Sequence, residues 1–190
     1  RVLFFWAFWP NAFEGLQPER TAAEGDKRLI PVISFVGKSN CGKTTYLVKL
    51  IAEMKKRGYK VGVIKHDVHG FDIDRPGKDT WRHARAGADV VCISSPQKMA
   101  LIQKVDKELA LSEVARRVEG VDLIFTEGYK QEGWIKVEVY RQAACAAPLC
   151  RRDELLAMVS DIRLHEELPT FRPGAPEAMA DFLVERFLKN

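Results

Sequence analysis

A short glycine-containing segment has the residue types and spacing that best fit a known chemistry. It runs Gly37-Lys38-Ser39-Asn40-Cys41-Gly42-Lys43-Thr44, and Thr45 follows. Glycines let a backbone turn tightly and approach an anion, so that successive N–H groups point inward at phosphate oxygens. A lysine reaches the outer phosphates of a nucleotide there, and the neighbouring hydroxyl ligates Mg²⁺. We therefore predict that residues Gly37 to Thr45 bind a nucleotide, with Thr44 as a metal ligand.

An ordinary glycine turn without a ligand is the structural alternative for this segment. The flanking sequence argues against it, because an apolar run precedes the loop and a helical pattern follows it. The start of that helix would add unpaired N–H groups and a positive dipole end to the anion site. Cys41 is interpreted as a small residue that the loop tolerates, with a reactive thiol beside the phosphate as the alternative.

A second polar segment, residues 65–79, is dense in ionisable side chains and follows the next predicted strand. Its Asp74-Arg75-Pro76-Gly77 has the D-x-x-G form, in which the Asp holds Mg²⁺ through water and the Gly N–H meets the outer phosphate. His66 and His69 are candidates for binding a metal ion or a substrate phosphate, and Lys65 is a further candidate residue. The alternative for the whole segment is a solvated surface loop.

An acidic residue closes a later apolar strand, where Glu127 precedes Gly128. A carboxylate at that place can hold or orient the Mg²⁺ shell of a bound nucleotide. We predict this role for Glu127, with an ordinary polar strand end as the alternative. Lys130 follows closely and is a further candidate.

These residues must be positioned by an alternation of strands and helices. The sequence predicts strands over Ile30–Val36, Val61–Ile64, Val90–Ser94, Met99–Gln103, Val121–Thr126, Ile135–Tyr140 and Leu155–Ser160, and helices over Thr44–Arg57, Asp79–Arg85, Leu109–Val118 and Pro176–Leu188. The pattern favours an α/β class, a three-layer P-loop NTPase fold with a mainly parallel sheet flanked by helices. Ligands bind at the carboxyl ends of such strands, so the loops at Gly37, His66 and Glu127 are expected to meet.

Composition bounds the classes of protein. The chain has 190 residues, is 46% hydrophobic and carries a formal net charge of +4 without a run of like charges. We expect one P-loop domain over residues 29–190, preceded by an extension or linker over residues 1–28, and neither nucleic acid nor a membrane as a partner. The apolar stretch at the start is too short to span a bilayer.

The cysteines form no C-x-x-C pair, and we expect thiols in a reducing, cytoplasmic setting. There are four of them, Cys41, Cys92, Cys145 and Cys150. Cys145 and Cys150 are close enough in sequence that a shared metal site or a disulfide between them is a further hypothesis.

Together the motifs resemble a known family. The matching elements are Gly37–Thr44, Lys65-His66 with His69, Asp74 to Asp79, Arg82, Ala86 to Ala88 and Thr126 to Lys130, with a looser match through Lys136–Val139 and Val159–Asp161. They resemble the molybdopterin-guanine dinucleotide biosynthesis adapter proteins, MobB. The resemblance runs in order over most of the domain and is more specific than the P-loop alone.

The resemblance implies a GTPase-like P-loop fold, a homodimer, and GTP bound with Mg²⁺ and hydrolysed weakly at most. It implies an adapter role beside the guanylyltransferase that makes the dinucleotide form of the molybdenum cofactor. Carried over, Gly37–Thr45 bind the triphosphate, Asp74 to Gly77 form the D-x-x-G element, and Glu127 with Lys130 form the acidic strand end.

Three departures from the family leave alternatives open. Val68-His69 stands where the family often has two adjacent histidines, no N-K-x-D guanine signature appears, and the apolar N-terminus has no counterpart. GTP in preference to ATP therefore depends on the resemblance alone. A small-molecule kinase and a metallochaperone GTPase, with His66, His69 and a cysteine as ligands, are the alternative functions.

Overall fold

The structure is a computed structural model that describes residues 20–23, 26–130, 132 and 134–189. It divides into two compact units. The first unit comprises Arg1–His66 and Leu111–Asn190, and the second unit comprises Asp67–Ala110. Each unit is described by itself below.

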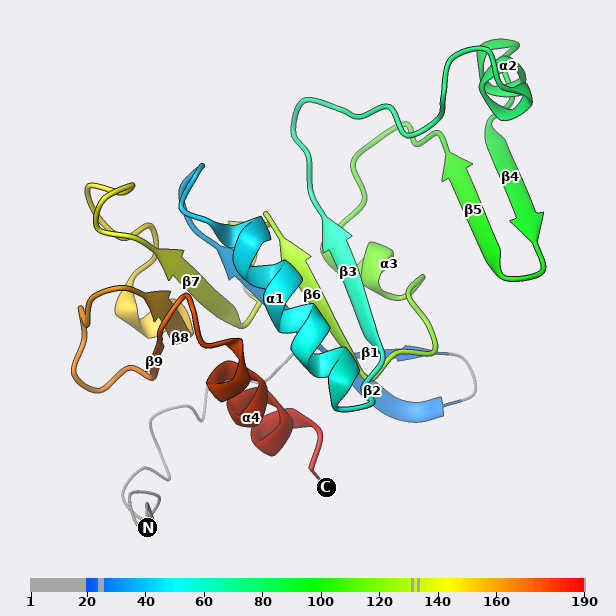
Figure 1. Ribbon diagram of the computed structural model, residues 1–190. Helices are drawn as coiled ribbons and strands as arrows, with labels where there is room; N and C mark the ends of the chain where they lie inside the picture. Colours follow the sequence, from blue (N-terminus) through cyan, green and yellow to red (C-terminus); the bar gives the residue numbers. More distant parts are fainter. Residues whose placement is uncertain (1–19, 24–25, 131, 133, 190) are drawn as a thin grey trace. The chain divides into compact units, whose positions relative to one another are not determined.

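A parallel sheet forms the centre of the first unit (Figure 1). Its strands are β2 (Asp26–Val36), β3 (Val61–Lys65), β6 (Leu123–Glu127), β7 (Lys136–Tyr140), β8 (Leu155–Ser160) and β9 (Thr170–Phe171), in the spatial order β3-β6-β2-β7-β8-β9. All these pairings are parallel. Strand β1 (Arg20–Ala23) pairs with β2 in the antiparallel sense. The strand that leads into the glycine loop is therefore central, with β6 on one side and β7 on the other.

The sequence of β2 explains its central place. Ile33 and Phe35 point to one hydrophobic cluster, whereas Ile30 and Val32 belong to the cluster on the opposite face. A strand buried on both faces needs a continuous apolar run instead of an alternating one, and β-branched residues suit it. Covering both faces of the sheet therefore requires helices on both sides.

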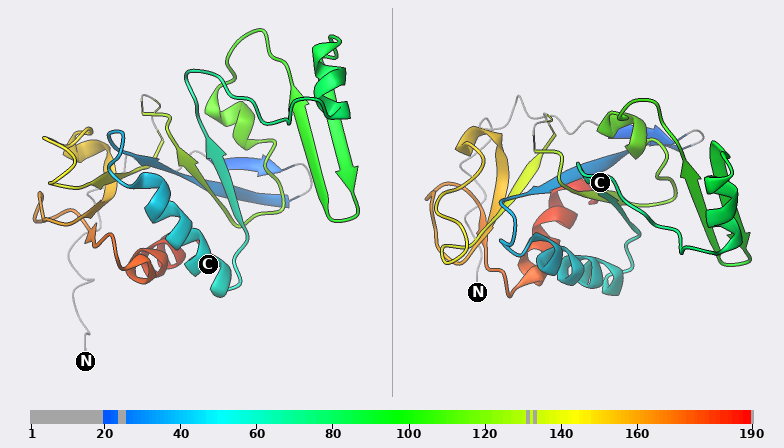
Figure 2. Two further views of the ribbon diagram at one scale, coloured as in Figure 1. Left: turned by 45° about the horizontal axis from the view of Figure 1, so that its top comes forward. Right: turned by 90° about the horizontal axis from the view of Figure 1, so that it is seen from above.

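The helices supply that cover in two layers (Figure 2). Helices α1 (Lys43–Lys56) and α4 (Pro176–Phe187) pack on one face, and the short α3 (Leu111–Ala115) packs on the other. A 3₁₀ turn, η1 (Arg152–Glu154), leads into β8. Tyr46, Leu47, Leu50 and Met54 form the buried side of α1, as its helical spacing predicts. The predicted α/β fold with a mainly parallel sheet between helices is confirmed.

The second unit consists of helix α2 (Asp79–Arg85) and the antiparallel strands β4 (Val90–Ser95) and β5 (Lys98–Gln103). The two strands form a separate two-stranded sheet. The sequence predicts the bounds of α2 correctly and both strands within one residue. It does not predict that these two strands pair with each other and form a sheet separate from the parallel one.

Other elements differ from the prediction at their ends. Strand β2 begins at Asp26, and β1 lies within the segment predicted as a linker, so regular structure starts before Leu29. Helix α3 is shorter than predicted, and β9 was not predicted. Residues 1–19, which hold most of the predicted extension, lie outside the described residues. The division of the chain at residue 28 stays a prediction.

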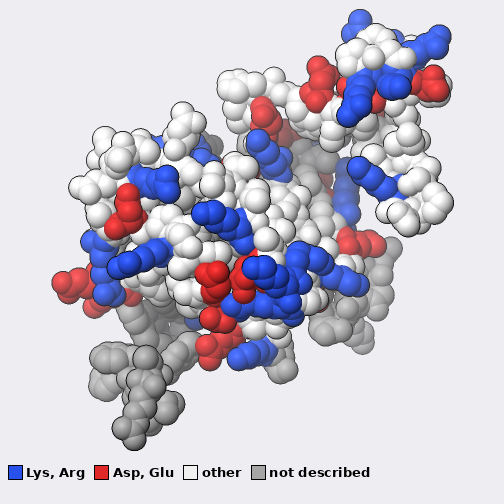
Figure 3. Space-filling view, viewed as in Figure 1, with Lys and Arg blue, Asp and Glu red and all other residues white. Residues whose placement is uncertain are grey.

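The surface mixes charges of both signs. On the face that Figure 3 shows, Lys and Arg side chains are interspersed with Asp and Glu. Ion pairs join some charged side chains of the first unit, such as Arg57 at the end of α1 with Asp181 of α4, whose Nη1 and Oδ1 atoms are 2.6 Å apart. Among the described residues, no helix combines the length and the apolar character that crossing a membrane requires.

Candidate nucleotide-binding site

The glycine loop connects the end of β2 at Val36 to the start of α1 at Lys43. Gly37 has φ +146°, and a Cβ there would run into the carbonyl oxygen of Val139 in the neighbouring strand β7. The first glycine of the motif is therefore required by close backbone packing as well as by its dihedral angle. Lys38 is half-buried, and Ser39, Asn40 and Thr45 are exposed at the surface where a ligand would approach.

Lys43 lies folded against the loop that it follows. Its Nζ donates hydrogen bonds to the carbonyl oxygens of Gly37 at 3.0 Å and Lys38 at 2.8 Å. Burial lowers the pKa of Lys43 below its ordinary value, the Glu127 carboxylate opposes that shift, and the positive charge of Lys130 adds to it. An ammonium group has three donors, so one remains for an anion held in the loop. A bound phosphate would favour the charged form of Lys43.

Thr44 and Glu127 meet although 83 positions separate them in the sequence. The Thr44 hydroxyl donates a hydrogen bond to Glu127 Oε1 at 2.6 Å. The sheet brings them together, because Phe35 near the end of β2 pairs in parallel register with Glu127 at the end of β6. A hydroxyl oxygen and a carboxylate oxygen are hard ligands of the kind that Mg²⁺ prefers. Both residues therefore fit the predicted magnesium shell.

Three further predicted residues of the first unit lie at the same edge of the sheet. Lys65 pairs with Glu127 in the register of β3 and β6, and the His66 N–H donates to the Glu127 carbonyl oxygen at 2.9 Å. Lys130 lies near enough to Lys43 to shift its pKa. The expectation that the Gly37, His66 and Glu127 loops meet at the carboxyl ends of the strands is correct.

The His66 ring stacks on Tyr129, with ring centroids 4.7 Å apart. Gly128 allows this approach, since a Cβ there would lie 2.8 Å from the Cβ of His66. The stacked pair joins the segments that directly follow β3 and β6. The packing gives His66 a structural role beside its predicted role in binding.

The remaining predicted residues, His69, Asp74 and Gly77, lie in the second unit. Asp74 Oδ1 accepts hydrogen bonds from the Thr80 hydroxyl at 2.9 Å and from the Arg75 N–H at 3.0 Å. Its Oδ2 is buried and has no hydrogen-bond partner among the described residues. The His69 N–H donates to Asp67 Oδ1 at 3.0 Å. The contacts of these residues are local, and their roles toward a nucleotide or metal ion stay predictions.

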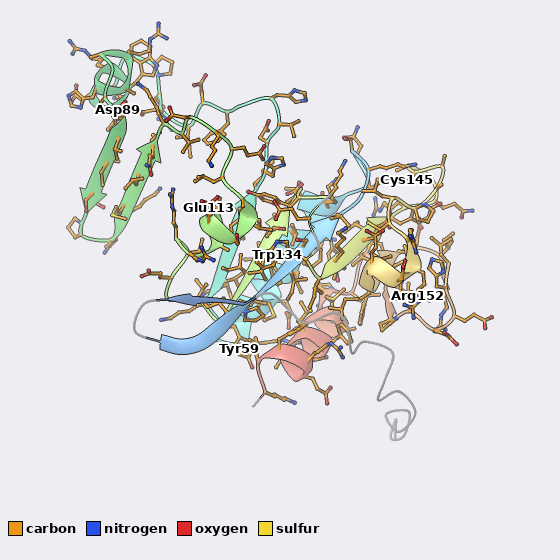
Figure 4. All side chains as sticks on the ribbon, turned by 180° about the vertical axis from the view of Figure 1, so that it is seen from behind. Tyr59, Asp89, Glu113, Trp134, Cys145 and Arg152 are labelled. Atoms are coloured by element: carbon orange, nitrogen blue, oxygen red, sulfur yellow. A yellow bond between two sulfur atoms is a disulfide. The ribbon has the colours of Figure 1, made fainter. Side chains whose placement is uncertain are left out.

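The cysteine prediction needs a correction. Cys41 of the glycine loop forms a disulfide with Cys145, in the loop that follows β7 (Figure 4), whereas Cys92 and Cys150 are free. The suggested pairing of Cys145 with Cys150 is wrong, and so is the expectation that all four are thiols. Cys41 is 1% exposed and points away from the loop surface, so its sulfur does not face a phosphate.

A metal site made of histidine and cysteine finds little support. Within the described ranges, no group of three or more His, Cys, Asp or Glu side chains could hold a metal ion. Thr44 is outside that class of ligands, so its pairing with Glu127 is unaffected.

Sequence reasoning missed one residue at this edge, Arg141. It follows β7 directly, and its Nε lies 3.9 Å from the place of a Cβ on Gly42. The rule that ligands bind at the carboxyl ends of parallel strands could have found it, because β7 is the neighbour of β2.

Comparisons with known proteins show which proteins this chain is similar to. The sequence model of the family described as "Molybdopterin guanine dinucleotide synthesis protein B" matches residues 32–161. The chain is 36% identical over 170 residues to the molybdopterin-guanine dinucleotide biosynthesis adapter protein of Escherichia coli, covering 86% of this chain and 97% of that protein. It is 34% identical over 157 residues to the protein of that name from Haemophilus influenzae, covering 81% and 88%.

Solved structures show the same likeness. The crystal structure of Bacillus subtilis MobB superposes with a TM-score of 0.68 at 25% identity, over 85% of this chain and all of that one, 100%. A crystal structure of molybdopterin-guanine biosynthesis protein B superposes with a TM-score of 0.63 at 27% identity, over 83% and 99%.

Proposed function

This chain belongs to the family of molybdopterin guanine dinucleotide synthesis protein B, and we propose that it binds GTP with Mg²⁺ and serves as an adapter. Its partner would be the guanylyltransferase that attaches GMP to molybdopterin. The observation that carries the proposal is the contact of Thr44 with Glu127 beside a formed phosphate loop. The relatives are named as adapter proteins of this pathway.

The glycine loop and the start of α1 would hold the triphosphate. Gly42 precedes the helix with φ +91°, and the first turn of α1 has backbone N–H groups without helical acceptors. Lys43, already held over the loop by two carbonyl oxygens, would contact the outer phosphates. These groups recognise the charge and shape of the phosphates, and they do not distinguish one nucleotide base from another. The choice of GTP rests on family membership.

Mg²⁺ would be held by Thr44, with Glu127 in direct contact or through water, and Asp74 is the further predicted ligand. A bound magnesium ion would neutralise charge on the outer phosphates. The hydrogen bond from Thr44 to Glu127 brings the two oxygens within 2.6 Å of each other. Hydrolysis of GTP is proposed to be slow and secondary to the adapter role. We propose that the protein acts in the cytoplasm.

We propose that the chain forms a homodimer through the second unit. Residues directly opposite each other in β4 and β5 share a face, so Val90, Leu101 and Met99 lie together on one face of the hairpin. They are 49%, 54% and 66% exposed. Two strands with one apolar face open to water are marginally stable alone, and a second copy of this chain would cover that face.

A competition of GTP against ATP for the purified chain, with and without the guanylyltransferase, tests the proposal. We expect preferential GTP binding that requires Mg²⁺, slow hydrolysis by the chain alone, and association with the transferase. Equal affinity for ATP would reject the preference for GTP. Fast hydrolysis without a partner would reject the adapter role.

A further inference from the structure

The guanidinium group of Arg141 lies beside the phosphate loop. Its Nε is 3.9 Å from where a Cβ on Gly42 would be, and Gly42 immediately precedes Lys43. The residue is exposed and stands at the carboxyl end of β7, next to the strand that leads into the loop. Arg141 therefore adds a positive charge beside the loop on the side of β7, whereas Glu127 lies on the side of β6.

The backbone around Arg141 is held in a tight turn. Its carbonyl oxygen accepts hydrogen bonds from the N–H groups of Ala144 at 3.0 Å and Cys145 at 2.9 Å. The next residue, Gln142, donates its N–H to Asp161 Oδ1 at 3.0 Å, at the end of β8. The turn is thus attached to the sheet on the side away from β2. We call residues 141–145 the arginine turn.

A covalent bond attaches the arginine turn to the phosphate loop. Cys145 ends the turn, and its disulfide partner Cys41 directly precedes Gly42, with Cα atoms 6.6 Å apart. Both sulfur-bearing side chains are buried, and they pack with Tyr140, Leu155 and Met158. The cross-link therefore joins the turn that begins with Arg141 to the residue directly before Gly42, which the Arg141 side chain approaches.

The Arg141 side chain has no hydrogen bond or ion pair with the residues that the structure describes. Other arginines of this unit do, since Arg57 contacts Asp181 and Arg151 contacts Asp153. A planar guanidinium has five donors arranged in a fork that matches phosphate oxygens. Held beside a phosphate loop with its donors unused, it fits an anion that the loop itself would bind.

We propose that Arg141 contacts the phosphates of the bound nucleotide and that the Cys41–Cys145 disulfide keeps it in that position. The inference rests on the proposed function and adds both a residue and a form of regulation to the same site. Reduction by a dithiol splits the sulfur–sulfur bond. Each sulfur gains one electron and one proton, and the dithiol becomes a cyclic disulfide. The freed turn then holds the guanidinium less firmly, so nucleotide affinity falls.

The first test is the Kd for GTP of Arg141→Ala, measured by calorimetry without reductant. Loss of a charge-assisted contact is expected to weaken binding by about 10- to 100-fold, and Arg141→Lys to restore part of it. Arg116→Ala removes an exposed positive charge elsewhere in the first unit and should change the Kd by no more than about twofold. Unchanged affinity of Arg141→Ala would overturn the proposal.

The second test separates positioning from general stability through the response to dithiothreitol. Reduction of the unsubstituted chain is expected to weaken GTP binding by about 2- to 10-fold, the cost of ordering one long side chain. Cys145→Ser should match the reduced chain and ignore the reductant, whereas Cys150→Ser, which removes a free thiol, should keep the response. Arg141→Ala should also ignore the reductant, since the disulfide acts through that side chain.

The outcomes distinguish the two proposals. An unsubstituted chain that binds no GTP would reject the proposed function and this inference together. GTP binding with an Arg141→Ala variant that still responds fully to dithiothreitol would reject the inference alone. A thermal unfolding midpoint of nucleotide-free Arg141→Ala close to that of the unsubstituted chain would show that the effect belongs to binding.

Discussion

The strands of the two units differ in how far their apolar side chains are buried. In the first unit every residue of β7 and β8 is buried, and β6 is buried up to Glu127. In the second unit, Val91 is the one buried residue among those that the structure describes in β4 and β5. A sheet covered on both faces fixes the loops at its edge, so the first unit can form a phosphate site by its own packing. The second unit leaves apolar side chains of its two strands exposed.

The largest expected difference concerns stability and compares two leucines. Leu50 of α1 is fully buried, and Leu50→Ala should lower the free energy of unfolding by about 2–5 kcal/mol through lost burial and a cavity. Leu101 of β5 is 54% exposed, and Leu101→Ala should cost no more than about 0.5 kcal/mol at a protein concentration too low for self-association. Urea unfolding followed by circular dichroism measures both.

Raising the protein concentration sharpens this comparison. If a second copy covers the hairpin, the cost of Leu101→Ala grows with concentration, because association stabilises the unsubstituted chain. The cost of Leu50→Ala would stay nearly the same. A Leu101→Ala cost that is small at every concentration would contradict the proposed dimer through this face.

The next largest effect concerns nucleotide affinity and compares two lysines. Lys43→Ala removes the ammonium that two loop carbonyls hold in place, and GTP binding should weaken by about 10- to 150-fold. The far-UV circular dichroism should not change, since the side chain is only partly buried. Lys98→Ala in the exposed strand β5 is the matched control, with an expected change of about twofold at most. Retained affinity of Lys43→Ala would mean that the loop is not the site.

The carboxylates give the third comparison, Glu127 of the first unit against Asp74 of the second. Glu127→Gln should weaken Mg²⁺ affinity in the presence of GTP by about 10- to 100-fold, because Thr44 already hydrogen-bonds to this carboxylate. Titration of Mg²⁺ into each variant measures the effect. The residue whose loss makes GTP binding independent of Mg²⁺ belongs to the metal shell.

The Asp74→Asn variant tests whether the D-x-x-G element contributes to Mg²⁺ binding. The buried Oδ2 of Asp74 has no hydrogen-bond partner among the described residues, and a metal shell is one way to satisfy it. An effect as large as that of Glu127→Gln would assign Asp74 to the metal shell. If neither substitution alters the Mg²⁺ dependence, both assignments fail.

The same contrast explains what the sequence could predict. Continuous apolar runs such as Ile30–Val36 identify buried parallel strands, and the alternation with helices fixes where their loops gather, so Gly37, His66 and Glu127 were expected to meet. Periodicity does not say which strands pair, and the hairpin of β4 and β5 was therefore not foreseen. Both of its strands look like any other short apolar run.

The missed features of the site depend on contacts that are distant in sequence. Cys41 and Cys145 are 104 positions apart, and only the adjacency of β2 and β7 brings them together. Arg141 belongs to no sequence motif. It lies beside Gly42 because β7 is next to β2 in the sheet. A phosphate motif is local and can be read from one segment, whereas residues that neighbouring strands supply can be found only after the order of the sheet is known.

The smallest expected effect tests whether the second unit opens independently of the first. Arg85 lies over the ring of Trp81 in α2, with its guanidinium carbon 5.7 Å from the ring centroid. Such a contact at an exposed site contributes about 0.5–1 kcal/mol, so Arg85→Ala should speed hydrogen exchange of the α2 amides by about 2- to 5-fold. Arg82→Ala in the same helix changes helix propensity equally without removing a ring contact, and it should have a smaller effect.

The amides of β6 should exchange at unchanged rates in both variants, because they belong to the first unit. Faster exchange in β6 as well would show that the two units unfold together and that their contrast in burial does not extend to stability.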